Sequence, residues 1–284
     1  MGAVNASLSS GMATISASLI ERTMNTKKPI STMFVAAFFS LSMNAAHASM
    51  ITGTSFDRSS LKVQYIEQHQ HNSMNKTTTV AYLSPDNRLL AYKEVLFTKA
   101  GFCPSFEIYF AHNKRSVGIT PKNEEILLFT REENGKQNQK AIPNVFKTGE
   151  SDTLVCDAGF DNFVREQISG KTYIAEHSFY FALPNHLTLL KMNIREIKPP
   201  DLDSKTRKFK EMNCSQCEEN DFRYFIIEPE NWLYRKLTSP VTLVYHKNQL
   251  LIFSGRSNIA SKQHGITDVI IFYEYSKQTH APSH

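Results

Sequence analysis

Apolar and polar positions alternate along most of the chain after residue 60. In the segment "LKVQYIEQ", for example, Leu61, Val63 and Tyr65 fall on one side of an extended backbone. A period of two predicts β-strands, and Pro, Asn, Asp and Gly between the bursts predict turns. The strands expected from this pattern cover residues 61–68, 76–83, 89–98, 105–110, 116–120, 124–132, 173–184, 187–197, 222–229, 240–246, 249–255 and 267–275.

One segment in the middle of the chain has a different period. In "VCDAGFDNFVREQI", Phe160, Phe163, Val164 and Ile168 follow one another at helical spacing. Asp157 precedes them where an N-cap residue is expected. The pattern predicts an amphipathic helix over residues 157–168 with a narrow apolar stripe.

The order of these elements predicts the architecture. A polar loop over residues 133–151 precedes the helix, and a charged segment over residues 198–221, with one helical turn, interrupts the later strands. Residues 230–237 are expected to form a short helix. We therefore expect a mainly β (α+β) fold: a large curved antiparallel sheet or open half-barrel with one central helix packed on its concave face.

The N-terminal region predicts export. Residues 24–48 contain Lys27 and Lys28, then an apolar run, then the small-residue pattern "AHA" that ends at Ala48. This is typical of a signal peptide cleaved before Ser49, which places the protein in the periplasm or outside the cell, with no stable membrane span after cleavage. Residues 1–23 have no such pattern and are interpreted as a leader from a misassigned start. Residues 49–284 are expected to form a single mainly-β domain.

Net charge excludes one class of partner. Residues 1–48 carry three basic and one acidic side chain, so the formal net charge falls from +5 for the full chain to +3 for the predicted exported chain of 236 residues. Nucleic-acid-binding proteins concentrate Lys and Arg far more densely, so nucleic acid is not expected as a partner.

The predicted exported chain contains four cysteines, and an oxidising compartment favours disulfides. Three connectivities are possible; we predict Cys214 with Cys217 and Cys103 with Cys156. The local motif "CSQC" also fits a redox pair or half of a zinc site. Acidic residues follow it directly, which disfavours a reactive thiolate, and no second Cys or His pair stands at zinc-site spacing. A structural disulfide is the preferred interpretation.

The central helix carries the best candidates for chemistry. Asp157, Asp161 and Arg165 lie on its polar side, and they have two interpretations. In the first, Asp157 caps the helix and Asp161 pairs with Arg165 at i, i+4. In the second, the carboxylates form an acid/base pair, which would need a third group from elsewhere in the chain. We prefer the structural interpretation and keep all three as weak candidates for ligand binding.

Other motifs carry less information. His69 and His71 share one side of a strand, but a solvated strand end explains them better than a metal site does. Arg256 and Asn258, in "SGRSNI", could bind an anion or simply make a turn. No GxSxG, HExxH, P-loop or GxGxxG pattern occurs, so no catalytic residue, metal or cofactor is predicted.

Three stretches resemble an uncharacterised family of proteobacterial exported proteins: "CDAGFDNFVREQI", "FIIEPENWLYRKLTSPVTLVY", and "LLIFSGRSNI" followed by "DVIIFYEY". The resemblance covers most of residues 60–275 and implies no activity. The order of strands around a central helix also resembles the lipoprotein-carrier fold, a half-barrel that holds acyl chains under a helical lid. That second likeness concerns the fold alone.

Two functions from different classes follow. The first is a non-enzymatic exported protein that binds an apolar or amphipathic small molecule, or an envelope protein, on a curved sheet. The alternative is a hydrolase-like enzyme that uses Asp157, Asp161 and a His from another strand. Clustered titratable groups in a cleft would favour the second function, and an apolar cavity without them the first.

Overall fold

The structure is a computed structural model that describes residues 49–97, 101–146, 153–169, 175–214, 217–259 and 266–276. The predicted leader (residues 1–23) and signal peptide (residues 24–48) lie outside the described residues. All described residues belong to one compact unit of the chain, His47–His284.

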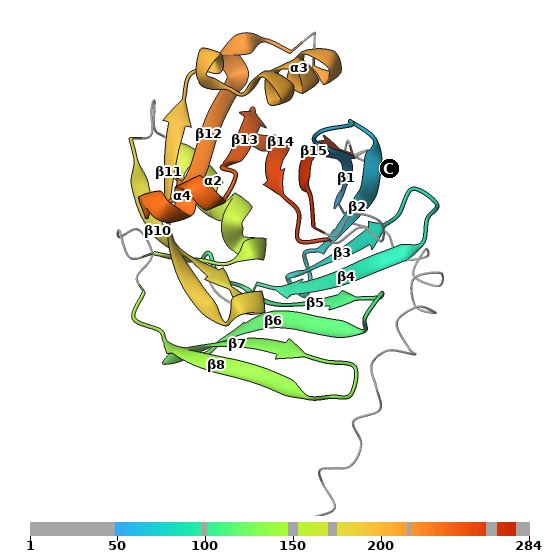
Figure 1. Cartoon of the computed structure of the whole chain (residues 1–284), viewed down its shortest axis with the longest axis vertical. Helices are drawn as coiled ribbons and strands as arrows, with labels where there is room; N and C mark the ends of the chain where they lie inside the picture. Colours follow the sequence, from blue (N-terminus) through green and yellow to red (C-terminus); the bar gives the residue numbers. More distant parts are fainter. Residues whose placement is uncertain are drawn as a thin grey trace, which may run out of the picture. The chain divides into compact units, whose positions relative to one another are not determined.

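Strands dominate the described part of the chain, and they form one sheet (Figure 1). The strands are β1 (Ser49–Asp57), β2 (Val63–Asn72), β3 (Thr77–Leu83), β4 (Leu89–Leu96), β5 (Ser105–Phe110), β6 (Arg115–Pro121), β7 (Glu125–Arg131), β8 (Gln137–Pro143), β9 (Leu154–Val155), β10 (His177–Leu183), β11 (Thr188–Ile197), β12 (Phe222–Pro229), β13 (Val241–His246), β14 (Gln249–Arg256) and β15 (Asp268–Tyr275).

The sheet is an extended meander. Its order is β8-β7-β6-β5-β4-β3-β2-β1-β15-β14-β13-β12-β11-β10-β9, so almost every strand pairs with its neighbour in the chain. The pairing of β1 with β15 joins the two ends of this part of the chain, with Ile51 opposite Tyr275. All pairs are antiparallel except β9 with β10. The predicted large curved antiparallel sheet is confirmed.

The sheet curves so strongly that its two ends meet. On β10, Phe179 packs with one core cluster, whereas Ala182 packs with the cluster formed by β2 to β7. The short 3-10 turn η3 (Pro184–His186) contacts β6 and β7. Both sides of β10 are therefore covered. The side that carries Phe179 belongs to the inner, concave face of the sheet, and the opposite side, with Ala182, packs on the strands at the other end.

Two helices cover opposite faces of the sheet (Figure 1). Helix α2 (Phe160–Ile168) follows the 3-10 turn η2 (Asp157–Gly159) and buries Phe163, Val164 and Ile168 against the inner face of β10 to β13. Helix α3 (Ser204–Asn213) packs Phe209 on the outer face, beside Phe56 and Phe272. A third helix, α4 (Trp232–Leu237), connects β12 to β13.

Both predicted disulfides are present: Cys103–Cys156, with Cα atoms 4.5 Å apart, and Cys214–Cys217, with Cα atoms 5.4 Å apart. The first disulfide fixes the residue immediately before η2, and the second closes the end of α3. None of the described helices has the length and apolar character needed to cross a membrane.

Several expectations need correction. The alternating pattern did not reveal β1, which contains Gly53 and several small polar residues, or β8, which begins with four polar residues and is exposed at six of its seven positions. Helix α3 has ten residues rather than one turn, and Asp203 caps it by accepting a hydrogen bond from Thr206 N at 3.1 Å. Asp157 is not an N-cap, because its carboxylate turns to a lysine on the sheet.

Candidate functional site

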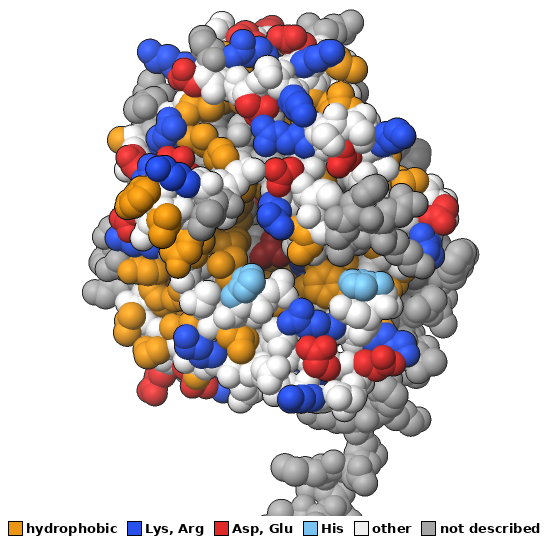
Figure 2. All heavy atoms as spheres, in the orientation of Figure 1, with side chains coloured by type: hydrophobic (Ala, Val, Ile, Leu, Met, Phe, Trp, Pro, Cys, Tyr) orange, Lys and Arg blue, Asp and Glu red, His pale blue; other side chains and the backbone are white. Residues whose placement is uncertain are grey.

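The inner face of the sheet carries charged side chains among its aromatic residues. Figure 2 shows a hollow in the middle of the molecule's visible face, with hydrophobic side chains on its walls and an acidic group deep inside it. We use the name inner polar cluster for six residues from β2, β4, η2 and α2: Glu67, His69, Lys93, Asp157, Asp161 and Arg165. Three groups of contacts make up this cluster.

The first group joins the sheet to the start of the central helix. Lys93 points inward from β4, between Ala91 and Val95, and its side chain is only 8% exposed. Its Nζ lies 2.7 Å from Asp157 Oδ2 and 5.7 Å from the centre of the Tyr82 ring. Burial disfavours the charged ammonium, but the carboxylate of Asp157 and the Tyr82 hydroxyl outweigh it, so the pKa of Lys93 lies above its usual value. Lys93 therefore stays protonated.

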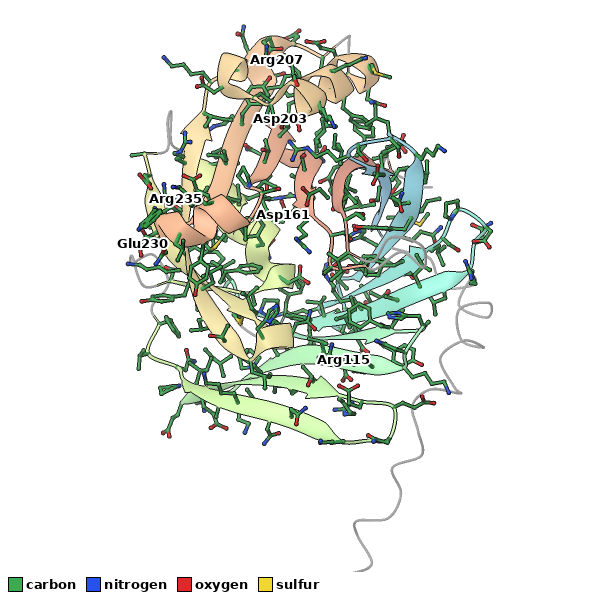
Figure 3. All side chains as sticks on the ribbon, viewed as in Figure 1. Arg115, Asp161, Asp203, Arg207, Glu230 and Arg235 are labelled. Atoms are coloured by element: carbon green, nitrogen blue, oxygen red, sulfur yellow. A yellow bond between two sulfur atoms is a disulfide. The ribbon has the colours of Figure 1, made fainter. Side chains whose placement is uncertain are left out.

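The second group lies one turn further along the helix. Asp161 Oδ1 accepts a hydrogen bond from Tyr245 on β13 at 2.8 Å, and Asp161 Oδ2 lies 2.8 Å from Arg165. The predicted i, i+4 ion pair is thus confirmed. Figure 3 shows Asp161 in the middle of the curved sheet. Its side chain is 37% exposed, and that of Arg165 is 36% exposed, so solvent reaches both.

The third group lies on β2 and β15. Glu67 is buried, and its carboxylate accepts a hydrogen bond from the Tyr273 hydroxyl at 3.2 Å. His69 Nε2 lies 2.8 Å from Glu67 Oε2. The expectation of a solvated strand end is wrong for His69, because residues two apart on a strand share a face and Glu67 therefore lies beside it. His71 contacts Thr78 instead, with Nδ1 and Oγ1 3.0 Å apart.

Several tyrosines surround these charges. Burial raises the pKa of Tyr82 and Tyr273 above the usual value, and the neighbouring Glu67 adds to the effect on both. Burial and Asp161 raise the pKa of Tyr275 to about 12. These phenols remain protonated at physiological pH, so they can donate hydrogen bonds but do not act as nucleophiles.

The remaining predicted candidates lie apart from this cluster. Arg256 ends β14 on its exposed side, opposite Asp268, and Asn258 is exposed. Between them, the buried Ser257 lies 3.0 Å from the Tyr65 hydroxyl and binds Ile259 N at 2.9 Å, so "SGRSNI" is a structured turn. Among the residues that the structure describes, no three His, Cys, Asp or Glu side chains are grouped so that they could hold a metal ion.

Sequence reasoning missed Lys93 and Glu67, the two most deeply buried members of the cluster. The signal was present in "LLAYKEVL", where Lys93 occupies an inward position between two apolar residues of the alternating pattern. A charged side chain at an inward strand position requires a partner. Its partner, Asp157, lies 64 residues further along the chain, and no local pattern connects the two.

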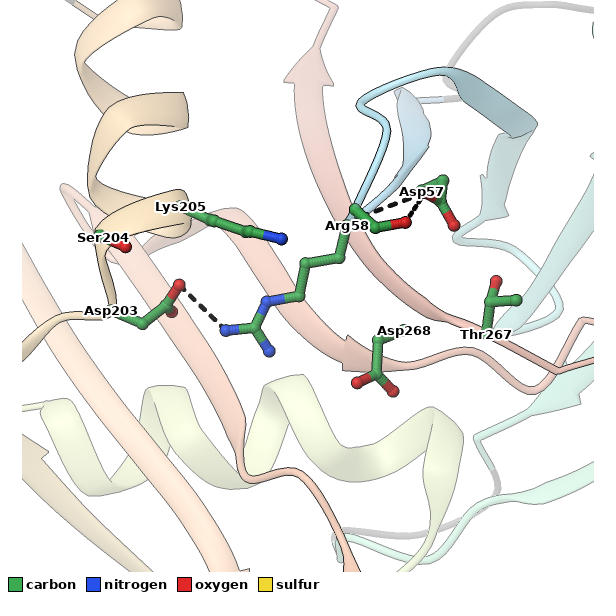
Figure 4. A pocket seen from close by; sticks show the side chains of 8 residues that line it. Asp57, Arg58, Asp203, Ser204, Lys205, Thr267 and Asp268 are labelled. Atoms are coloured by element: carbon green, nitrogen blue, oxygen red, sulfur yellow. Dashed lines mark hydrogen bonds and ion pairs between the residues drawn. The ribbon is translucent and has the colours of Figure 1, made fainter.

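A second hollow lies on the outer side of the sheet, near the start of α3 (Figure 4). It has a volume of about 580 Å³ and is lined by polar side chains from the β1–β2 turn, α3 and β15. Arg58 spans it and binds Asp203, with Nη2 and Oδ1 2.9 Å apart. Because Asp203 also caps α3, this contact fastens the helix to the sheet, and we interpret the second hollow as structural.

Comparisons with known proteins add little to this geometry. No known protein family and no curated protein matches the sequence. Among solved structures, the chain is similar to a beta-barrel-like protein of a domain of unknown function, DUF1849, from Brucella abortus. The TM-score is 0.44 and the sequence identity 6%, over 80% of this chain and 98% of that one. A similarity at this level supports no conclusion about function, and the resemblance to exported families stays a prediction.

Proposed function

We propose that the protein is a non-enzymatic binder that holds an amphipathic small molecule in the hollow of the inner face. The observation that carries this proposal is the position of the two pairs Lys93–Asp157 and Asp161–Arg165. Lys93 is buried, whereas the side chains of Asp157, Asp161 and Arg165 are 36 to 37% exposed, and aromatic and aliphatic side chains of the sheet pack around the two pairs. An apolar chain can pack on such walls while a polar head binds the charges.

The protonation states of the cluster support binding rather than catalysis. A nucleophilic lysine needs a lowered pKa, whereas the pKa of Lys93 is raised. Burial disfavours the charged form of Arg165, yet Asp161 raises its pKa overall, so it stays a cation. Fixed charges of both signs suit a ligand head that carries hydrogen-bond donors and acceptors, and they cost no proton transfer when the ligand binds.

The hydrolase-like alternative gains no support from the described residues. Asp157 and Asp161 contact Lys93, Arg165 and Tyr245. His69 is engaged with Glu67 and His71 with Thr78. An acid/base mechanism would need a histidine close to one of the two aspartates.

Export fits this proposal. Two disulfides suit an oxidising compartment, and an envelope or extracellular location would give the protein access to amphipathic molecules. Signal cleavage before Ser49 remains the prediction on which this location depends. An envelope protein bound to the curved sheet is the other partner that the sequence suggests.

The proposal is tested by titrating the protein with a fluorescent single-chain fatty acid in the absence of membranes. Replacing Lys93 with Gln should weaken binding about tenfold, because a charge-assisted contact of roughly 1.5 to 3 kcal/mol is lost. Lys210→Gln is the matched control, since Lys210 is also a buried lysine but belongs to α3, on the outer face. Equal affinities for both variants would contradict the proposal. Native mass spectrometry of protein purified from the envelope would identify a retained ligand.

A further inference from the structure

Helix α4 exposes an unusual set of side chains. Trp232 is 64% exposed, Leu233 51% and Tyr234 50%, and these three residues follow one another in the chain. Trp232 is the only tryptophan of the protein. Soluble proteins rarely expose adjacent large apolar residues, and such groups mark surfaces that contact a partner or a membrane.

Polar contacts hold α4 in place. Asn231 caps it by accepting a hydrogen bond from Leu233 N at 2.9 Å. Arg235 donates to Pro229 O at 2.7 Å and to Glu230 O at 2.9 Å, which ties the helix to the end of β12 (Figure 3). The exposed side chains therefore project from an anchored support, and little conformational entropy is lost when they bind.

The charge around α4 is basic. The helix carries Arg235 and Lys236, and an ion pair joins Arg235 to Glu228 of β12. Two further ion pairs, Lys191–Glu230 and Arg195–Glu228, lie beside the helix. This set contains four basic and two acidic side chains, a net charge of +2: Lys191, Arg195, Arg235, Lys236, Glu228 and Glu230. Lys236 Nζ lies 4.8 Å from the centre of the Trp232 ring, so a cation accompanies the largest apolar group.

We propose that α4 docks the protein onto a lipid bilayer that contains anionic headgroups. Trp and Tyr next to Lys and Arg are the residues enriched where proteins meet the membrane–water interface, with the rings at headgroup depth and the cations on the phosphates. A protein partner fits less well, because lysine is depleted at the centre of protein interfaces. This surface is independent of the ligand proposed above, although the hollow opens on the same visible face of the molecule (Figure 2).

The single tryptophan gives a direct test on the full chain, purified from the envelope with the N-terminus that the cell leaves on it. Vesicles of phosphatidylcholine and phosphatidylglycerol in equal parts should shift the Trp232 emission to shorter wavelengths, and brominated lipids should quench it. Leu233→Ala/Tyr234→Ala keeps the tryptophan, and it should partition into these vesicles about tenfold less strongly. Lys236→Gln should lose about fivefold on anionic vesicles and nothing on pure phosphatidylcholine.

Two controls make the result unambiguous. Met74 is 93% exposed in the β2–β3 turn, so Met74→Ala removes an exposed apolar side chain elsewhere and should partition like the parent chain. Lys93→Gln tests the hollow, and it should leave vesicle binding unchanged even if it abolishes fatty-acid binding. The inference is overturned if the emission of Trp232 does not respond to vesicles, or if the α4 double variant changes the sedimentation coefficient of the protein instead, which would identify α4 as a contact between two copies.

Discussion

Helices α2 and α3 pack on the same sheet from opposite sides, and the surroundings of their polar residues differ. Both bury a phenylalanine, Phe163 in α2 and Phe209 in α3, and both adjoin a disulfide. The polar side of α3 faces bulk solvent, and its buried Lys210 is neutralised by Glu219 and lies 4.2 Å from the centre of the Phe222 ring. The polar side of α2 and the turn η2 before it face into the curved sheet, where Asp157 of η2 binds Lys93 and Asp161 of α2 accepts a hydrogen bond from Tyr245.

The difference suggests what each helix is for. Charges placed inside a fold are costly unless they are paired, and apolar residues in the same places are often at least as stable. The contacts of α3 can be explained by stability alone. Three members of the inner polar cluster are partly exposed to solvent, and α2 also has an apolar side that packs on the sheet. Ligand binding by the cluster is the proposal that the variants below test.

The largest expected loss of stability comes from removing a buried phenylalanine, and it is similar for α2 and α3 because both helices are held by buried apolar side chains. Phe163→Ala should lower the free energy of unfolding by about 3 to 5 kcal/mol, since the ring is fully buried between Phe102 and Phe179. Phe209→Ala should cost about 3 kcal/mol. Chemical denaturation measures both. A harmless Phe163→Ala would mean that α2 is not anchored by its apolar side.

The two disulfides should differ more clearly in how much each contributes to the free energy of unfolding. Cys103 and Cys156 are 53 residues apart, so replacing both with Ser should cost about 4 kcal/mol through the entropy of the unfolded chain. Cys214 and Cys217 are three residues apart, and their replacement should cost about 1.5 kcal/mol. Thermal unfolding with and without a reductant checks the order. A reversed order would assign the local disulfide a larger role than closing the end of α3.

Acid should weaken the attachment of α3. Burial raises the pKa of Asp203, but hydrogen bonds from Thr206 and Arg58 outweigh it and hold the pKa below its ordinary value. A lowered pKa contributes stability that is complete above the ordinary value near pH 4 and is lost as the pH falls through the lowered value. Asp203→Ala should therefore cost about 1 kcal/mol at neutral pH, and the difference from the parent chain should shrink in acid. A difference independent of pH would contradict this account.

The smallest expected effect on stability is at the polar side of α2. Asp161→Asn should cost under about 1 kcal/mol, because its ion pair with Arg165 is partly exposed to solvent. Fatty-acid binding should weaken in the same variant, as measured by titration. If Asp161→Asn left stability intact but abolished a measurable hydrolytic activity, α2 would be a catalytic element and the non-enzymatic proposal would be wrong.

Local patterns predicted much of this fold. Period-two alternation located most strands, helical spacing located α2 with its buried Phe163 and Val164, and the cysteine count with the expected compartment led to both disulfides. Three strands were missed: β1 and β8 lack apolar alternation, and β9 has only two residues. Strand β1 pairs with β2 on one side and with β15 on the other, and this pairing makes it a strand although its own sequence lacks the alternating pattern.

The sequence by itself determined most strands, helix α2 and the presence of cysteine bridges, because alternation and helical spacing depend on neighbours a few residues away and bridges follow from the cysteine count. Only the tertiary structure decided which polar residues meet. Asp157 fits a helix cap in every local respect, yet its carboxylate binds Lys93, which the curvature of the sheet brings across from β4. Side-chain alternation records which residues share a face, but the bending that makes one face concave is a property of the whole sheet.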